Sequence, residues 1–294
     1  MRHRKRNEIT CMETLPNRID YAERLNRVIA YIHSNLDDSL SFEKVAEIAY
    51  LSPYHFHRIY RAARGETIAA TVRRLRLYRA ASQLAHTMMP IDEVSRLAGY
   101  RNVQSFTRIF NEVFSMPPAR YRQHGNHVQY EPQYIDRNLA MYDVTIKTLP
   151  ELQVVSIYHR GAYTKIGQAY DQLFGWLTPR GLVDEQTRVM TIGYDDPATV
   201  PEAELRSRAC ATVSKECTVD APLEWWKIEG GRYAVLRYKG SYDALPSIYQ
   251  WLFGTWLLQS GLALRDAPPF EEYINTPLNT APADLLTDIY LPLA

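Results

Sequence analysis

The sequence predicts a multidomain protein: an all-α domain with two helix-turn-helix motifs, followed by an α+β domain of two duplicated strand-helix-strand-strand units. Three observations predict this division. Pairs of short helices recur within the first 124 residues, residues of the remainder match each other at a fixed spacing, and the two parts carry opposite charge. We expect domains at 1–124 and 142–294, with a polar linker at 125–141.

The charge of the chain is divided between its two parts. The 294 residues contain 34 Lys and Arg against 33 Asp and Glu, which is nearly neutral overall. Up to Gly125 there are 20 basic and 12 acidic residues, and beyond it 14 basic and 21 acidic. A basic domain favours polyanions, whereas an acidic one repels them and attracts cations.

The first pair of helices is predicted between residues 41 and 65. Ser41 suits the N-cap of a short helix. Ser52 and Pro53 provide an N-cap and a first-turn proline for the second helix, which Gly65 ends. That second helix has an apolar face of Phe56, Ile59, Tyr60 and Ala63 and an opposite face of Tyr54, His57, Arg58 and Arg61.

A second pair of the same kind follows a long amphipathic helix from about Ile68 to His86. Asp92 is expected to cap its short helix, Gly99 to form the turn and Asn102 to cap the second helix. Aromatic and aliphatic residues again share one face of that helix, and the other face carries Gln104, Thr107, Arg108 and Asn111.

Two such units joined by one helix suit double-stranded DNA. Each second helix can lie in a major groove, and the two can read successive grooves about 34 Å apart. Arg58 and Arg108 suit guanine, and Gln104 suits adenine. A polar helix face also occurs where a helix simply meets solvent. The repetition of matching apolar and basic faces favours DNA.

Two sequence motifs stand out in this half. The first is Val45-Ala46-x-x-Ala49-x-x-Ser52-x-x-His55-Phe56-x-Arg58-x-Tyr60, and the second runs from Ile91 through Ala98-Gly99-Tyr100 to Pro117-Pro118-x-x-Tyr121-Arg122. Both resemble motifs of the arabinose-regulator (AraC/XylS-type) family of transcription factors. The resemblance covers about residues 20–124. It implies that Tyr54, His57 and Arg58 face one groove, and that Val103, Gln104, Thr107 and Arg108 face the next.

The second half matches itself. At a spacing of 79 residues, Gly161-x-Tyr163 corresponds to Gly240-x-Tyr242, and Leu173-Phe174-Gly175 to Leu252-Phe253-Gly254. Further matches at 80 residues include Gly181-Leu182 with Gly261-Leu262. Each copy reads as strand, helix, strand, strand, the first strands being Val144–Tyr158 and Trp226–Tyr238. A groove between two such copies is a common place for a small molecule.

The candidate ligand residues are aromatic and acidic. In the strand Phe270-Glu271-Glu272-Tyr273, alternation puts Glu271 with Tyr273 on one face and Glu272 on the other. A carboxylate among aromatic rings attracts a lipophilic cation. Candidate walls are Tyr163, Tyr242, Trp225 and Trp226, whereas Tyr170, Trp176, Tyr249 and Trp256 have helical spacing and are expected in the core.

This half resembles the gyrase-inhibitor-like (GyrI-like) effector-binding domain over residues 142–294. The resemblance rests on the repeated unit, on Gly-x-Tyr before each helix and on Phe270-Glu271-Glu272-Tyr273. It implies a hydrophobic, often cationic ligand and a central glutamate. The Phe-Glu-x-Tyr pattern selects Glu271, with Glu272 as the alternative. The order of the two domains resembles regulators of the right-origin-binding type.

We expect the protein to be a bacterial transcription regulator that binds promoter DNA and senses a small molecule. By family analogy, activation of transcription is expected rather than repression. A hydrolase using Glu271 and Tyr273, or a protein-binding module, is the alternative for the C-terminal domain. We expect no enzyme activity, cofactor or metal, and RNA polymerase is a further candidate partner. Three cysteines without a CxxC pair, and no apolar segment after the basic N-terminus, favour the cytoplasm. No apolar run reaches the ~20 residues that span a membrane.

Overall fold

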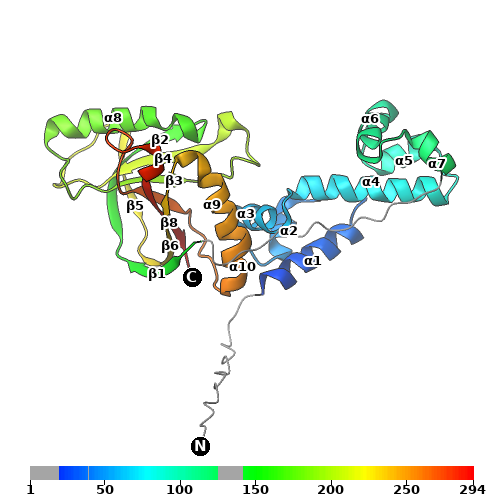
Figure 1. The fold of residues 1–294 in the computed structure, drawn as a ribbon, viewed down its shortest axis with the longest axis horizontal. Helices are drawn as coiled ribbons and strands as arrows, with labels where there is room; N and C mark the ends of the chain where they lie inside the picture. Colours follow the sequence, from blue (N-terminus) through cyan, green and yellow to red (C-terminus); the bar gives the residue numbers. More distant parts are fainter. Residues whose placement is uncertain (1–19, 39, 125–141) are drawn as a thin grey trace, which may run out of the picture.

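A computed structural model describes residues 20–38, 40–124 and 142–294 (Figure 1). The linker predicted at 125–141 and the basic N-terminal run lie outside the described residues. Within those residues no helix is both long and apolar enough to cross a bilayer.

The first helix-turn-helix unit comprises α1 (Tyr21–Ser34), α2 (Phe42–Ile48) and α3 (Pro53–Arg64). Its helix ends follow the sequence signals. The Ser41 side chain accepts a hydrogen bond from the backbone of Lys44, and Gly65 ends α3 in the left-handed conformation with φ 74°. Ser52 occupies the N-cap of α3, but its side chain makes no capping hydrogen bond.

The second unit lies at the far end of α4 (Ile68–His86) from the sheet (Figure 1). It contains α5 (Ile91–Leu97), α6 (Val103–Phe114) and α7 (Pro118–His124). Asn102 caps α6 as predicted, whereas Pro90 precedes α5 and Asp92 lies in its first turn, so the prediction of Asp92 as its cap was wrong. A hydrophobic cluster of its own, including Phe106, holds this unit together.

The C-terminal part forms one antiparallel sheet in the order β1-β6-β8-β7-β3-β4-β2-β5. Its strands are β1 (Val144–Leu149), β2 (Leu152–Arg160), β3 (Val189–Gly193), β4 (Arg206–Ala211), β5 (Leu223–Ile228), β6 (Gly231–Lys239), β7 (Phe270–Tyr273) and β8 (Leu286–Pro292). The duplicated copies meet where β3 pairs with β7. This order places equivalent strands of the two copies at equal distances from that central pair.

Each predicted first strand proves to be two strands. Pro150 interrupts the stretch Val144–Tyr158, so β1 and β2 replace the single strand, and β5 and β6 do the same in the second copy. The predicted strand-helix-strand-strand order is present, preceded in each copy by one more strand. These extra strands are exchanged, because β1 pairs with β6 of the second copy and β5 pairs with β2 of the first.

Helices of both copies cover the sheet. The first copy contributes α8 (Gly167–Leu177), whose Leu173 and Leu177 pack over β2 and β4. The second contributes α9 (Leu245–Trp251), a π-helical segment η6 (Leu252–Trp256) and α10 (Leu257–Ser260). One hydrophobic cluster includes residues of α1–α3, of this second helix and of β6 and β8. The first helix-turn-helix unit therefore shares a core with the C-terminal part.

Candidate functional site

A partly buried carboxylate lies at the centre of the sheet, between the two copies. Glu271 on β7 accepts a hydrogen bond from the Tyr249 hydroxyl at 3.0 Å from Oε1 and one from the Tyr273 hydroxyl at 2.9 Å from Oε2. The Tyr273 hydroxyl also lies 3.0 Å from Thr191 Oγ1, which in turn lies 2.8 Å from the Tyr170 hydroxyl of α8. Polar groups thus connect α8 with α9 through Glu271.

Glu271 forms no ion pair with any of the described residues. Burial raises the pKa of this carboxyl, and the hydrogen bonds from Tyr273 and Tyr249 oppose that rise. The ring of Tyr242 lies 5.2 Å from that of Tyr273. A carboxylate surrounded by tyrosine rings and outside every ion pair of the described residues is suited to a cation.

Glu272 is held on the opposite face of β7. Arg188 donates two hydrogen bonds to its carboxylate at 2.6 and 2.7 Å, and the Tyr290 hydroxyl donates another at 2.8 Å. Burial alone would raise the pKa of Glu272, but the hydrogen bonds from Arg188 and Tyr290 outweigh it and the pKa is lowered. The negative charge of Glu272 is therefore already balanced by Arg188, whereas Glu271 has no such partner in an ion pair of the described residues. The two adjacent glutamates thus have different environments.

The other candidate ligand residues are not all near Glu271. Tyr242 lies beside it, whereas the Tyr163 hydroxyl donates to the backbone oxygen of Asp195 at 2.8 Å, just beyond the end of β3. Trp225 and Trp226 lie on β5 at the edge of the sheet. Trp225 is exposed, and Trp226 lies under the guanidinium of Arg208 at 3.7 Å. The structure does not bring these tryptophans to Glu271.

Tyr170 and Tyr249, which helical spacing placed in the core, do pack against hydrophobic clusters of the C-terminal part. Both are partly buried, and their hydroxyls also reach Thr191 and Glu271 at the centre of the sheet, which helical spacing alone does not show. They correspond to each other at the spacing of 79 residues. The signal in the sequence was that tyrosine occurs at both equivalent positions, although phenylalanine or leucine would fill a core equally well.

The polar face of α3, predicted to read DNA, lies against the C-terminal domain. The Tyr54 hydroxyl donates to the backbone oxygen of Gly193 at 2.9 Å, and Arg58 donates to that of Asp195 at 2.9 Å. Arg61 forms an ion pair with Asp196 at 3.1 Å. His57 stacks on the ring of Phe42 with 3.7 Å between centroids.

The corresponding face of α6 is uncovered. Gln104 and Arg108 are exposed, Val103 is 36 % exposed and Thr107 is partly buried. Arg108 forms an ion pair with Glu112 one turn away, at 2.9 Å. The two predicted recognition helices therefore differ, since α6 presents its polar face to solvent and the C-terminal domain partly covers that of α3.

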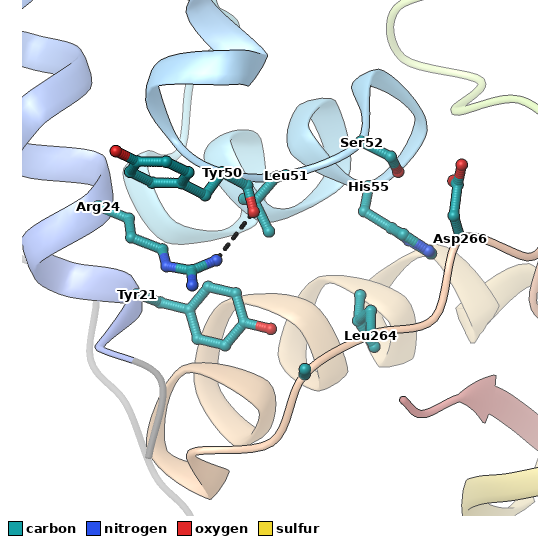
Figure 2. Close-up of a pocket in the computed structure, with 9 residues that line it drawn as sticks. Tyr21, Arg24, Tyr50, Leu51, Ser52, His55, Leu264 and Asp266 are labelled. Carbon is teal, nitrogen blue, oxygen red and sulfur yellow. Dashed lines mark hydrogen bonds between the residues drawn. The ribbon is translucent and has the colours of Figure 1, made fainter. Parts of the chain in front are cut away.

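A pocket of about 230 Å³ lies at the boundary between the two parts (Figure 2). Figure 2 shows Arg24 between the rings of Tyr21 and Tyr50, with its guanidinium donating to the Tyr50 backbone oxygen at 2.9 Å. His55 Nε2 lies 2.7 Å from the backbone oxygen of Arg265. Burial, the main cause, lowers the pKa of His55 to about 4, so the imidazole is neutral near pH 7.

This architecture defines a class of regulators in which helix-turn-helix units for DNA are joined to a duplicated domain for a small molecule. The family model described as "GyrI-like small molecule binding domain" matches residues 142–294, and that described as "Helix-turn-helix domain" matches residues 45–124. The chain belongs to the GyrI-like family. Both resemblances expected from the sequence, AraC-type and GyrI-like, are confirmed.

Curated relatives cover one part or the other. "Probable transcriptional regulator YgiV" of Escherichia coli K12 is 30% identical over 159 residues, which are 53% of this chain and 99% of the relative. "Uncharacterized HTH-type transcriptional regulator YbfP" of Bacillus subtilis is 31% identical over 102 residues, 35% of each chain. The chain thus spans about a third of that second relative. The solved C-terminal domain of EcmrR shares 21% identity, covers 52% of this chain and 98% of that one, and has a TM-score of 0.44.

Proposed function

We propose that the protein regulates transcription by binding promoter DNA through α3 and α6, and that its C-terminal domain binds a lipophilic cation at Glu271. One observation carries the ligand class: the Glu271 carboxylate lies among Tyr249, Tyr273 and Tyr242 with no ion pair in the described residues. Hydrophobic contact, cation–π attraction and opposite charge act together there. Tyr242 and Tyr273 are the proposed walls.

Tetraphenylphosphonium is a suitable probe, because it is lipophilic and permanently cationic. We expect calorimetric titration of the full chain to show saturable binding that falls at least tenfold in Glu271→Gln, since one charge-assisted contact is worth about 1.5–3 kcal/mol. Glu204→Gln, on an exposed residue, removes one negative charge elsewhere and is the control. Tetraphenylborate has the same shape and opposite charge, and equal binding of both probes would refute a cation site.

The proposed DNA contacts are Tyr54, His57, Arg58 and Arg61 of α3, and Val103, Gln104, Thr107 and Arg108 of α6. Their support is the fold of two helix-turn-helix units on a basic half, with the N-terminus of α6 capped by Asn102. Binding to promoter duplexes should weaken steeply as salt rises, because phosphate contacts release counterions. RNA polymerase is a further proposed partner, and the cytoplasm, where such DNA is found in bacteria, is the proposed location.

Hydrolysis is a second candidate for the C-terminal domain. The hydrogen bond of 2.9 Å between Tyr273 and Glu271 would support a carboxylate acting as general base on a water molecule, and burial already raises the pKa of Glu271. Turnover of a reactive ester or epoxide by the full chain, lost in Glu271→Gln and in Tyr273→Phe, would favour this reading over binding alone.

A further inference from the structure

The first recognition helix is engaged by the domain that holds the ligand site. Tyr54 and Arg58 both bond to backbone oxygens at the end of β3, and Arg61 pairs with the side chain of Asp196. The side chain of Asp196 is only 8% exposed, whereas that of Arg61 is 40% exposed. These side chains belong to the face expected to meet DNA, and a helix face cannot contact base edges and the β3–β4 connection together.

The engagement continues into a close backbone contact. A Cβ atom placed on Gly254 of η6 would lie 2.3 Å from the backbone oxygen of Ala62 in α3. Only glycine permits this approach, because backbone cannot move aside as a flexible side chain can. The equivalent glycine of the first copy, Gly175 in α8, has no atom within 4 Å of such a Cβ. The contact with α3 is therefore particular to the second copy.

The same side chains connect α3 to the Glu271 site. The Arg58 guanidinium lies 4.9 Å from the ring of Tyr54 and 5.8 Å from that of Phe253. The Phe253 ring stacks near that of Tyr249, and the Tyr249 hydroxyl donates a hydrogen bond to Glu271. The Asp195 backbone oxygen accepts from both Arg58 and Tyr163. The charge of Arg58 also lowers the pKa of Glu271 against the effect of burial. Arg58 thus supplies positive charge to the surroundings of Glu271.

We propose that this arrangement is an autoinhibited state, in which η6 and the β3–β4 connection cover α3, and that a lipophilic cation bound at Glu271 displaces Arg58 and releases α3 for DNA. The coupling rests on the proposed function of Glu271. A ligand shifts such an equilibrium only if it binds the two states differently. Here the difference is electrostatic, because a cation at Glu271 is repelled by Arg58 when α3 is covered and is not when α3 has left.

The occlusion can be tested without a ligand. Gly254→Ala should force α3 away, and Gly175→Ala is the matched control in the equivalent position. With a random-sequence duplex of about 30 base pairs, Gly254→Ala should bind at least tenfold tighter than wild type. Its affinity should also fall more steeply with salt, since Arg58 and Arg61 become free to meet phosphates. X-ray scattering should give a larger radius of gyration for this variant alone.

Asp196→Ala is a second route to the open state if Gly254→Ala does not fold, because it removes the ion pair with Arg61 without changing α3 or the Glu271 site. It should act in the same direction with a smaller effect. Wild-type DNA affinity and wild-type dimensions in folded Gly254→Ala and Asp196→Ala would overturn the occlusion.

The coupling has its own measurement. Linkage requires that opening strengthen cation binding, so Gly254→Ala should bind tetraphenylphosphonium tighter than wild type and Gly175→Ala should not. Equal affinity of wild type and an open Gly254→Ala variant would overturn the coupling. A wild-type chain that bound no cation while Gly254→Ala still opened and gained DNA affinity would contradict the proposed ligand and support the occlusion.

Discussion

Thr191 and Glu271 are cross-strand partners on β3 and β7, and they occupy the same position in the two copies of the duplicated unit, 80 residues apart. The duplication therefore places two side chains face to face at the centre of the sheet. Two glutamates there would repel each other, and one would stay protonated. With threonine on one side, the site holds a single carboxylate, which Tyr273 approaches together with the Thr191 hydroxyl.

A single carboxylate predicts a simple dependence of cation binding on pH. Tetraphenylphosphonium does not titrate, so proton linkage at the site comes from Glu271, whose pKa burial raises above its ordinary 4.5. Affinity should be constant above that raised pKa and should fall about tenfold per pH unit below it. Calorimetric titrations across acidic pH check this. In Glu271→Gln the residual binding should not change with pH. A wild-type affinity that does not fall at acidic pH would contradict the site.

The adjacent Glu272 should behave differently when its partner is removed. Arg188→Met leaves a largely buried carboxylate without its two hydrogen bonds, so we expect the free energy of unfolding to fall by about 2–3 kcal/mol. This loss is at or below the low end of what breaking a buried ion pair usually costs, because the Arg188 side chain is 30% exposed. Denaturant unfolding measures this loss. Lys165→Met, which removes the exposed pair with Glu202, should change stability by less than about 0.5 kcal/mol.

Much of the fold followed from local signals in the sequence. Asn102 and Gly65 mark helix ends through capping and the left-handed backbone, and the spacing of Gly161 and Gly240 revealed the duplication. The exchange of β1 and β5 was not predictable, because a break at Pro150 shows that a strand is divided but not which strand it pairs with.

The site was predictable only in part, for a similar reason. Alternation along β7 separated Glu271 from Glu272, but the sequence alone could not show that Arg188, 84 residues away, neutralises Glu272. Trp225 and Trp226 suggested an aromatic wall by composition, and the sheet order puts them at its edge. The covering of α3 was hidden too, since Arg58 and Arg61 suit phosphates and backbone oxygens equally well as donors.

His55 predicts a loss of stability in acid. Its pKa is lowered to about 4 chiefly by burial and also by the Arg58 charge, while the bond to Arg265 and the Asp266 charge oppose this. A lowered pKa means that the full contribution of neutral His55 is present above pH about 6.5 and is lost as pH falls toward 4. Between about pH 7 and pH 4, wild type should lose about 3 kcal/mol of unfolding free energy more than His55→Gln. Parallel losses in the two proteins would assign the acid sensitivity elsewhere.

The exposed face of α6 predicts a change in DNA binding without a change in stability. Arg108 forms an exposed ion pair with Glu112 one turn away, so Arg108→Ala should alter the free energy of unfolding by no more than about 0.5 kcal/mol. If Arg108 reads a guanine, the same change should cost about 1–3 kcal/mol on the preferred duplex and little on a duplex altered at that base pair. Binding to duplexes selected from a random pool by wild type, compared with single-base variants, measures both. A uniform loss across all duplexes would instead show that Arg108 contacts phosphate, with a salt slope reduced by about one unit.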